Sequence, residues 1–196
     1  LGRVVQSKNP DFAVGDLVTS RNGFREFFVS NGQGLARLAA DPDLPVIAYM
    51  HAMGMTGFTA YGGILHIGQL KDGEQVFVST AAGAVGSIAA QIAKIKGCYV
   101  VGSTGSADKA AWLKDEVGLD AVINYKEQPI KKALEEATRK GIDVYFDNVG
   151  GDHLDAAFAH ASDFARFAIC GMIDVYNDGR PQEMRYLIRT IPARIR

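Results

Sequence analysis

Residues Gln75 to Gly97 read QVFVSTAAGAVGSIAAQIAKIKG and contain three successive patterns. The apolar run from Val76 to Val78 has the length and β-branched character of a buried strand. A turn of small residues follows, and apolar residues then recur at helical spacing until Gly97, a typical helix C-terminal residue. A strand, a glycine turn and a helix in this order form the phosphate-binding unit of a doubly wound sheet.

The turn itself carries part of the dinucleotide-binding pattern. Gly83 would let the backbone approach a pyrophosphate, and Gly86 would let the helix pack closely on the strand. The N–H groups that open the helix would face the phosphate charge. The fingerprint G-x-G-x-x-G is incomplete, however, because Ala81 stands at its first glycine. A small-residue turn before a helix is also ordinary α/β packing, so the turn alone fits both interpretations.

The same rhythm of strand and helix continues along the chain. We predict strands at 99–103, 121–124, 144–146 and 167–170, and helices at 107–116, 129–139 and 153–161. Strands that alternate with helices of about ten residues require a parallel sheet that is covered on both faces. The predicted fold class is therefore α/β, a Rossmann-type doubly wound parallel sheet.

The first 50 residues have a different pattern. Short apolar runs flank the turns at Gly15-Asp16 and at 21–23, which predicts a small β structure. A rigid connector at 41–45 leads into an apolar segment, where we expect Gly54 and Gly57 to break any long helix. A helix from Thr59 to Ile67 would remain possible.

Composition excludes several classes of partner. With 47% hydrophobic residues, 22% charged residues and a net charge of −1, the chain has no basic surplus for nucleic acid or an anionic membrane. No window approaches about 18 continuous apolar residues, and no signal peptide is recognisable, so we expect no membrane association. The two cysteines, Cys98 and Cys170, are too few for a disulfide framework, and we expect both to be buried free thiols of a cytoplasmic protein.

A zinc site is not expected either. Catalytic zinc needs nearby cysteine and histidine ligands, but the four histidines lie too far apart to supply a local pair. His153 and His160 are seven residues apart on one predicted helix, and we expect them on a solvated face.

The end of the second predicted strand indicates which dinucleotide would bind. In an NAD site an acidic residue lies about 20 positions after the glycines, and that count reaches Ser103 in the segment 102–106, GSTGS. Small hydroxyl residues, together with Lys109 in the next helix, suit a 2′-phosphate, which a carboxylate would repel. The sequence therefore predicts NADP(H). Lys109 alone would be an ordinary solvated lysine, and the missing acid is the stronger part of the argument.

Four strings at 54–61, 81–86, 146–151 and 170–177 (GMTGFTAY, AAGAVG, FDNVGG and CGMIDVYN) occur in one order and spacing. Together they resemble the zinc-independent medium-chain dehydrogenase/reductase superfamily, and within it the family of prostaglandin reductases, leukotriene B4 12-hydroxydehydrogenases and alkenal double-bond reductases. The resemblance implies that residues 1–50 end an incomplete GroES-like catalytic domain. Residues 51–196 would then be an NADP-binding Rossmann domain whose C-terminal part is missing.

The resemblance also implies an activity, the NADPH-dependent reduction of the C=C bond of α,β-unsaturated aldehydes and ketones, by hydride transfer to the β-carbon. Tyr176 would be the catalytic residue, because a phenol can donate a hydrogen bond to developing enolate charge. A purely cofactor-binding or structural tyrosine is equally compatible with its position. The residues implied to bind the cofactor are Met55, Thr59, Gly83, Ala84, Val85, Gly86, Ser103, Lys109, Tyr125, Asn148, Cys170, Gly171, Met172, Ile173, Asp174, Val175 and Tyr176.

These residues would serve different parts of NADP(H). Gly83–Gly86 would hold the pyrophosphate, Lys109 and Tyr125 the 2′-phosphate, Asn148 the ribose or phosphate side, and 170–176 the nicotinamide half. The partners expected from the family are a small α,β-unsaturated carbonyl substrate and a second copy in a homodimer. Two alternatives stay open, namely a quinone reductase of the same superfamily and an NADPH-binding homologue without turnover.

Overall fold

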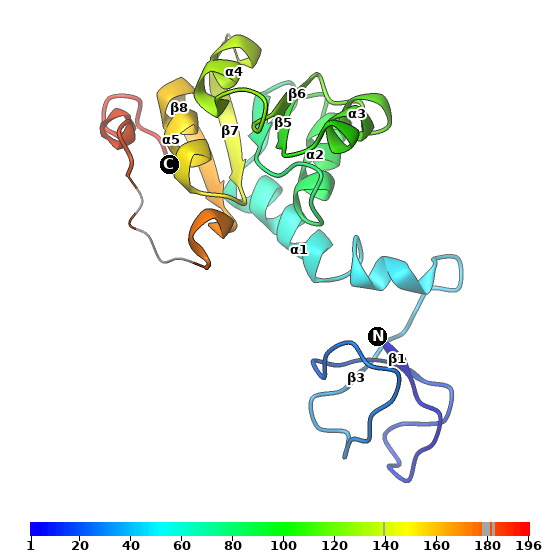
Figure 1. Ribbon diagram of the computed structural model, residues 1–196. Coiled ribbons are helices and arrows are strands. Elements are labelled where there is room, and N and C mark those ends of the chain that lie inside the picture. The colour runs from blue at the N-terminus through cyan, green and yellow to red at the C-terminus, as the bar shows by residue number, and fades with distance from the viewer. Residues whose placement is uncertain (139, 178–180, 182) are drawn as a thin grey trace. The chain divides into compact units, whose positions relative to one another are not determined.

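A computed structural model describes residues 1–138, 140–177, 181 and 183–196. The chain forms two compact units, Leu1–Gly54 and Met55–Arg196, which are described separately below (Figure 1). That these units are the end of a GroES-like domain and a cofactor-binding domain stays a prediction.

The first unit contains a small antiparallel sheet, as predicted. Its strands are β1 (Gly2–Arg3), β2 (Leu17–Thr19) and β3 (Ala36–Arg37), in the order β1-β2-β3, and a 3-10 helix, η1 (Val46–Met50), follows. Residues 20–35, all of which the structure describes, form no strand, so the strand-like reading of the apolar run after residue 23 is wrong. Phe24 and Val29 are 96% and 101% exposed there, because no second sheet face covers them.

The second unit is built on a five-stranded parallel sheet, which confirms the predicted fold class (Figure 1). The strands lie in the order β6-β5-β4-β7-β8, with β4 at the centre. After β4 the chain moves outward through β5 and β6, then crosses to β7 on the other side of β4. The carboxyl ends of β4 and β7 therefore border the switch point at which doubly wound sheets bind ligands. The strand bounds are β4 Gln75–Val78, β5 Tyr99–Thr104, β6 Ala121–Asn124, β7 Ile142–Asp147 and β8 Ala161–Ile169.

Helices cover both faces of this sheet. One apolar cluster packs one face with α1 (Met55–Tyr61), the π-helix η2 (Gly62–Ile67), α2 (Gly86–Ile95) and α3 (Ala107–Asp115). The other face carries α4 (Ile130–Ala137) and α5 (Gly151–His160). Among the described helices, none is both long and apolar enough to cross a membrane.

The central strand β4 is apolar throughout Val76 to Val78 because both faces of the sheet are covered there. Val76 and Val78 belong to the cluster under α1 and α2, whereas Phe77 belongs to the cluster under α4 and α5. Because successive strand residues point to opposite faces and both faces are covered, all three side chains are fully buried.

Some boundaries differ from the prediction. Gly57 does not break the first helix; it is buried inside α1, which packs against α2, and this packing outweighs the low helix propensity of glycine. β8 begins at Ala161, six residues earlier than predicted, so α5 ends at His160. The predicted end of α4 at Arg139 lies outside the described residues, and α4 itself ends at Ala137.

The outer edge of β8 is partly occupied by the end of the chain. The N–H of Arg196 donates to the carbonyl of Ala165 at 2.9 Å, and the N–H of Phe167 donates to the carbonyl of Arg196 at 2.8 Å. This alternation is the parallel-strand pattern. Arg196 thus pairs with β8 in the same direction as the rest of the sheet.

Candidate nucleotide-binding site

The turn after β4 is fixed by backbone contacts rather than by a complete glycine fingerprint. The N–H of Ala81 donates to the carbonyl of Ser103 at 2.8 Å, and the methyl of Ala81 is fully buried. A Cβ at Gly86 would lie 2.3 Å from the carbonyl oxygen of Thr80, and one at Gly83 would lie 3.1 Å from the same atom. Close packing therefore excludes a side chain at the third glycine position and leaves little room at the second, while the first position accepts alanine.

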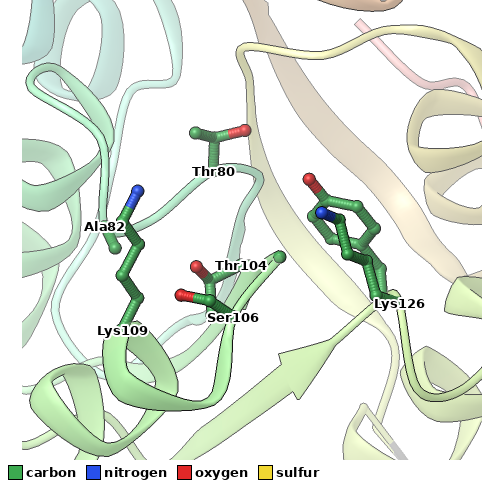
Figure 2. Close-up of a pocket in the computed structure, with 8 residues that line it drawn as sticks. Thr80, Ala82, Thr104, Ser106, Lys109 and Lys126 are labelled. Atoms are coloured by element: carbon green, nitrogen blue, oxygen red, sulfur yellow. The ribbon is translucent and has the colours of Figure 1, made fainter.

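A cavity of about 300 Å³ lies where β4, β5 and β6 end. Figure 2 shows Lys109 and Lys126 on either side of Thr104 and Ser106, with Thr80 above them. The lining comes from the turn after β4, the end of β5, the first turn of α3 and the residues after β6. The cavity thus occupies the carboxyl edge of the sheet, where the sequence placed the dinucleotide. Its lining residues are Thr80, Ala82, Thr104, Gly105, Ser106, Lys109, Tyr125 and Lys126.

The chemistry of this lining favours an anion. It contains two lysine ammonium groups and several hydroxyl groups, and no carboxylate is among the described residues that line it. The first acid after β5 is Asp108, in the first turn of α3, and it is not among the residues that line the cavity. Asp120, before β6, is engaged elsewhere: its Oδ2 accepts from the N–H of Val100 at 2.6 Å and pairs with Lys94 at 2.8 Å. The donor set fits a 2′-phosphate and would bind the bare hydroxyl of NAD less specifically.

The structure brings some of the predicted 2′-phosphate residues together and separates one. Lys109 and Tyr125 both line the cavity. Ser103 does not, because its side chain is fully buried and its Oγ accepts from the N–H of Thr80 at 3.3 Å. The hydroxyls at the cavity belong instead to its neighbours Thr104 and Ser106.

Sequence reasoning missed Lys126 as a site residue. It directly follows Tyr125 after β6, and strand ends of a parallel sheet meet at one edge, so its position was an available signal. The lining residues outside the predicted segments are Thr80, Ala82 and Lys126, whereas Thr104, Gly105 and Ser106 belong to the segment 102–106 that was expected to suit the 2′-phosphate.

Two further predicted segments meet at the end of β7. The side-chain amide of Asn148 donates to the carbonyl of Ser79 at 2.7 Å, which ties Asn148 to the turn after β4. The segment that follows β8, with the 3-10 helix η3 (Ile173–Val175), contacts the turn after β7: the N–H of Ile173 donates to the carbonyl of Asn148 at 3.3 Å. Asn148 and residues 170–176 are therefore neighbours.

Tyr176 lies at the end of that segment and is 65% exposed. Its hydroxyl accepts from the N–H of Met172 at 3.2 Å, so the phenol folds back over its own loop. The hydroxyl hydrogen can still be donated to another group. Its catalytic role stays a prediction.

A second cavity of about 280 Å³ joins two other predicted residues. Thr59 from α1 and Cys170 from the end of β8 line it, together with Gly63, Ile67, Ala168 and Ile169. Met55 is exposed on α1 and is not in this lining. The structure thus supports a shared location for Thr59 and Cys170, one helix turn away from Met55.

The two cysteines differ in exposure. Cys98 is buried, as predicted, but Cys170 is exposed, so that part of the prediction is wrong. Cys170 comes directly after β8, at the carboxyl edge of the sheet. Partial burial of the thiol, followed by the charge of Asp147, raises the pKa of Cys170.

His153 corrects another expectation, since it is buried rather than solvated. Its ring lies parallel to Phe77 with centroids 6.4 Å apart and meets the edge of Tyr125 at 5.0 Å. Burial lowers the pKa of His153, although the carboxylates of Asp147, Asp152 and Asp174 act in the opposite direction. His153 thus packs behind the Tyr125 ring that lines the cavity.

Comparisons with known proteins identify the family of the chain. A family model described as zinc-binding dehydrogenase matches residues 84–190. Prostaglandin reductase 1 of Bos taurus is 48% identical over 92% of this chain and 56% of that protein. A 2-alkenal reductase (NADP(+)-dependent) of Nicotiana tabacum is 42% identical over 100% of this chain and 57% of its own length. The chain spans about half the length of the curated relatives it matches.

A solved structure shares the fold closely. The crystal structure of CurA in complex with NADPH from Vibrio vulnificus has a TM-score of 0.88 and 37% sequence identity, over 99% of this chain and 59% of that one. Although the family description names zinc, the residues that this structure describes include no group of three or more His, Cys, Asp and Glu able to hold a metal ion. The chain therefore belongs to the medium-chain dehydrogenase/reductases, and within them to the zinc-independent family of prostaglandin and alkenal reductases.

Proposed function

We propose that this chain is the cofactor-binding part of an NADP(H)-dependent oxidoreductase that reduces the C=C bond of α,β-unsaturated aldehydes and ketones. The cavity between Lys109 and Lys126 carries the proposal, because it offers two cations and several hydroxyl donors at the position where an NAD site has an acid. The names of the relatives, prostaglandin reductase and NADP(+)-dependent 2-alkenal reductase, support the same cofactor and substrate class.

In this proposal, different groups of residues bind different parts of NADP(H). Lys109, Lys126 and the hydroxyl of Tyr125 hold the 2′-phosphate. The pyrophosphate lies against Gly83 and is held by the N–H groups at the start of α2, where the helix dipole favours negative charge. Asn148 and residues 170–176 border the nicotinamide half, and the cavity lined by Thr59 and Cys170 accepts the ring or the substrate.

When bound, NADPH supplies a hydride for the β-carbon of the enone, and the α-carbon then takes a proton. The task of the protein is to stabilise the negative charge that develops on the carbonyl oxygen. Tyr176 is the proposed donor, because its exposed hydroxyl can give a hydrogen bond to that oxygen.

The test is NADPH oxidation by the purified protein with 4-hydroxynonenal, compared with NADH under the same conditions. We expect turnover with a clear preference for NADPH, and Lys109→Ala should reduce that preference by about tenfold, as expected for the loss of one charge-assisted contact. Lys114→Ala is the matched control, because Lys114 lies in the last turn of the same helix and does not line the cavity.

The other outcomes would point to the remaining candidates. Equal use of NADH would contradict the proposed 2′-phosphate site. Oxidation of NADPH by quinones but not by enones would favour a quinone reductase. NADPH binding without turnover on either substrate class would favour a non-catalytic homologue.

We further propose a homodimeric, cytoplasmic protein. The dimer is supported by the family resemblance, and the compartment by the two free thiols, which persist in reducing surroundings. Light scattering on the purified protein tests the dimer, and a monomer at micromolar concentration would contradict it. Cell fractionation tests the compartment.

A further inference from the structure

One buried oxygen atom connects the segments of the proposed cofactor site. Asp147 is the last residue of β7 and is fully buried. Its Oδ1 accepts four hydrogen bonds: from the Ser79 hydroxyl at 3.1 Å, the Tyr145 hydroxyl at 2.6 Å, and the N–H groups of Val149 and Gly150, both at 2.9 Å. The second oxygen, Oδ2, is also buried and has no hydrogen-bond partner among the described residues.

The partners of Asp147 lead to three different parts of the site. Ser79 opens the turn after β4, and its Oγ also accepts from the N–H of Asn148 at 2.8 Å. Val149 and Gly150 form the turn that carries Asn148. The backbone carbonyl of Asp147 accepts from the N–H groups that begin the third segment, Cys170 at 2.8 Å and Gly171 at 3.0 Å. Asp147 is therefore joined to the turn after β4, the turn after β7 and the segment after β8.

The buried carboxylate of Asp147 is stabilised by the hydrogen bonds that it accepts. Burying a charged oxygen is costly unless donors surround it, and here two hydroxyls and two backbone N–H groups do so. Gly150 is the residue before α5 and has a φ of 73°, a backbone conformation that glycine adopts without a steric penalty. Burial and the charge of Asp147 raise the pKa of Tyr145, which keeps its hydroxyl protonated and donating.

We propose that Asp147 is a positioning residue for NADP(H), with Tyr145 as its buried donor. Asp147 cannot reach the cofactor, since no part of it is exposed. Its carboxylate acts through Ser79 and through the turn that carries Asn148, while its backbone carbonyl holds the start of the 170–176 segment. This inference rests on the proposed function, because it concerns the same cofactor.

The test compares Tyr145→Phe and Asp147→Asn with the unaltered protein. Tyr145→Phe removes only a hydroxyl, and it should raise the KM for NADPH by about three- to tenfold while kcat at saturating NADPH stays within about twofold. Asp147→Asn keeps the shape but weakens all four bonds, and it should raise KM further. The matched control is Tyr99→Phe, at the opposite, amino end of β5, which should leave KM unchanged.

A second measurement follows the turn itself, without any cofactor. Hydrogen exchange of the Val149 and Gly150 amides should accelerate about tenfold in Tyr145→Phe, while amides within β5 keep their protection. Unchanged KM and unchanged exchange in both variants would overturn the positioning role. If the unaltered protein bound no NADPH, the proposed function itself would fail. If NADPH bound and exchange at these two amides accelerated while KM stayed unchanged, Asp147 would only fix the turn, and the inference would be overturned.

Discussion

At the scale of single residues, His153 makes the stability of the fold depend on pH. Its ring is buried between Phe77 and Tyr125, and its Nε2 has no hydrogen-bond partner among the described residues. Burial lowers the pKa of His153 below the value of about 6.5 expected for an unfolded chain. The unfolded chain therefore takes up a proton first when the solution is acidified.

We predict that the free energy of unfolding falls as the pH drops below about 6.5, by at most about 1.4 kcal/mol per pH unit from this histidine, and that the melting temperature falls with it. This contribution is fully present above the unfolded pKa and declines until the lowered folded pKa is reached. His153→Phe, which keeps the ring contact with Phe77, should flatten the profile. Melting curves over a pH series measure this, and His66→Phe, at an exposed histidine of η2, should keep the original slope.

Individual residues were the least predictable level. His153 was expected to face solvent because seven residues separate it from His160, but α5 is apolar on most sides and leaves no broad solvated face. Lys126 was missed although it follows β6 at the carboxyl edge of the sheet, and both it and its neighbour Tyr125 line the cavity. Lys109 was predicted because the sequence lacks an acidic residue about 20 positions after the glycines. Its place in the cavity lining is consistent with that prediction.

At the scale of elements, the seating of α2 depends on one missing side chain. A Cβ at Gly86 would lie 2.3 Å from the Thr80 carbonyl oxygen, so the helix would have to move away from the turn. Gly86→Ala should lower the free energy of unfolding by about 1–3 kcal/mol. Denaturant unfolding measures the change.

The control for this variant is Gly62→Ala in η2, where a Cβ would meet no described atom within 4 Å. There the higher helix propensity of alanine should stabilise the protein by about 0.5–1 kcal/mol. Equal losses in the two variants would contradict the steric explanation, since only Gly86 faces the Thr80 carbonyl.

Elements were predictable where local and long-range forces agree. The run from Val76 to Val78 became β4 because both faces of the sheet bury it. The strand at 121–124 was predicted at its observed bounds, and Gly97 and Gly118 follow the helices that they were expected to end. By contrast, the helix through Gly57 required the packing of α1 on α2, which local propensity does not contain.

At the scale of the whole second unit, Arg166 links the edge strand β8 to the chain that leads into β4. Its guanidinium pairs with Glu74 and donates to the carbonyl of Gly68 at 3.0 Å, with both charged side chains largely buried. Arg166→Leu would leave the Glu74 carboxylate unpaired and should destabilise the unit by about 3 kcal/mol. Thermal unfolding measures this.

The matching double variant, Arg166→Leu with Glu74→Leu, should recover much of that loss, because no buried charge remains without a partner. A double variant no more stable than Arg166→Leu would contradict this explanation, because the loss in the single variant would then not come from the unpaired Glu74 carboxylate.

During synthesis on the ribosome, the central strand β4 can pair early with only one of its two neighbouring strands, β5, because β7 is made later. β5 follows it closely, but β7 begins at Ile142, about forty residues after β5 ends, and synthesis of that length takes roughly 2–8 s. During this interval Phe77 lacks the Tyr145 ring on which it later stacks at 4.9 Å. The nascent chain thus presents an open apolar strand edge for several seconds, which is the kind of surface that chaperones shield from aggregation.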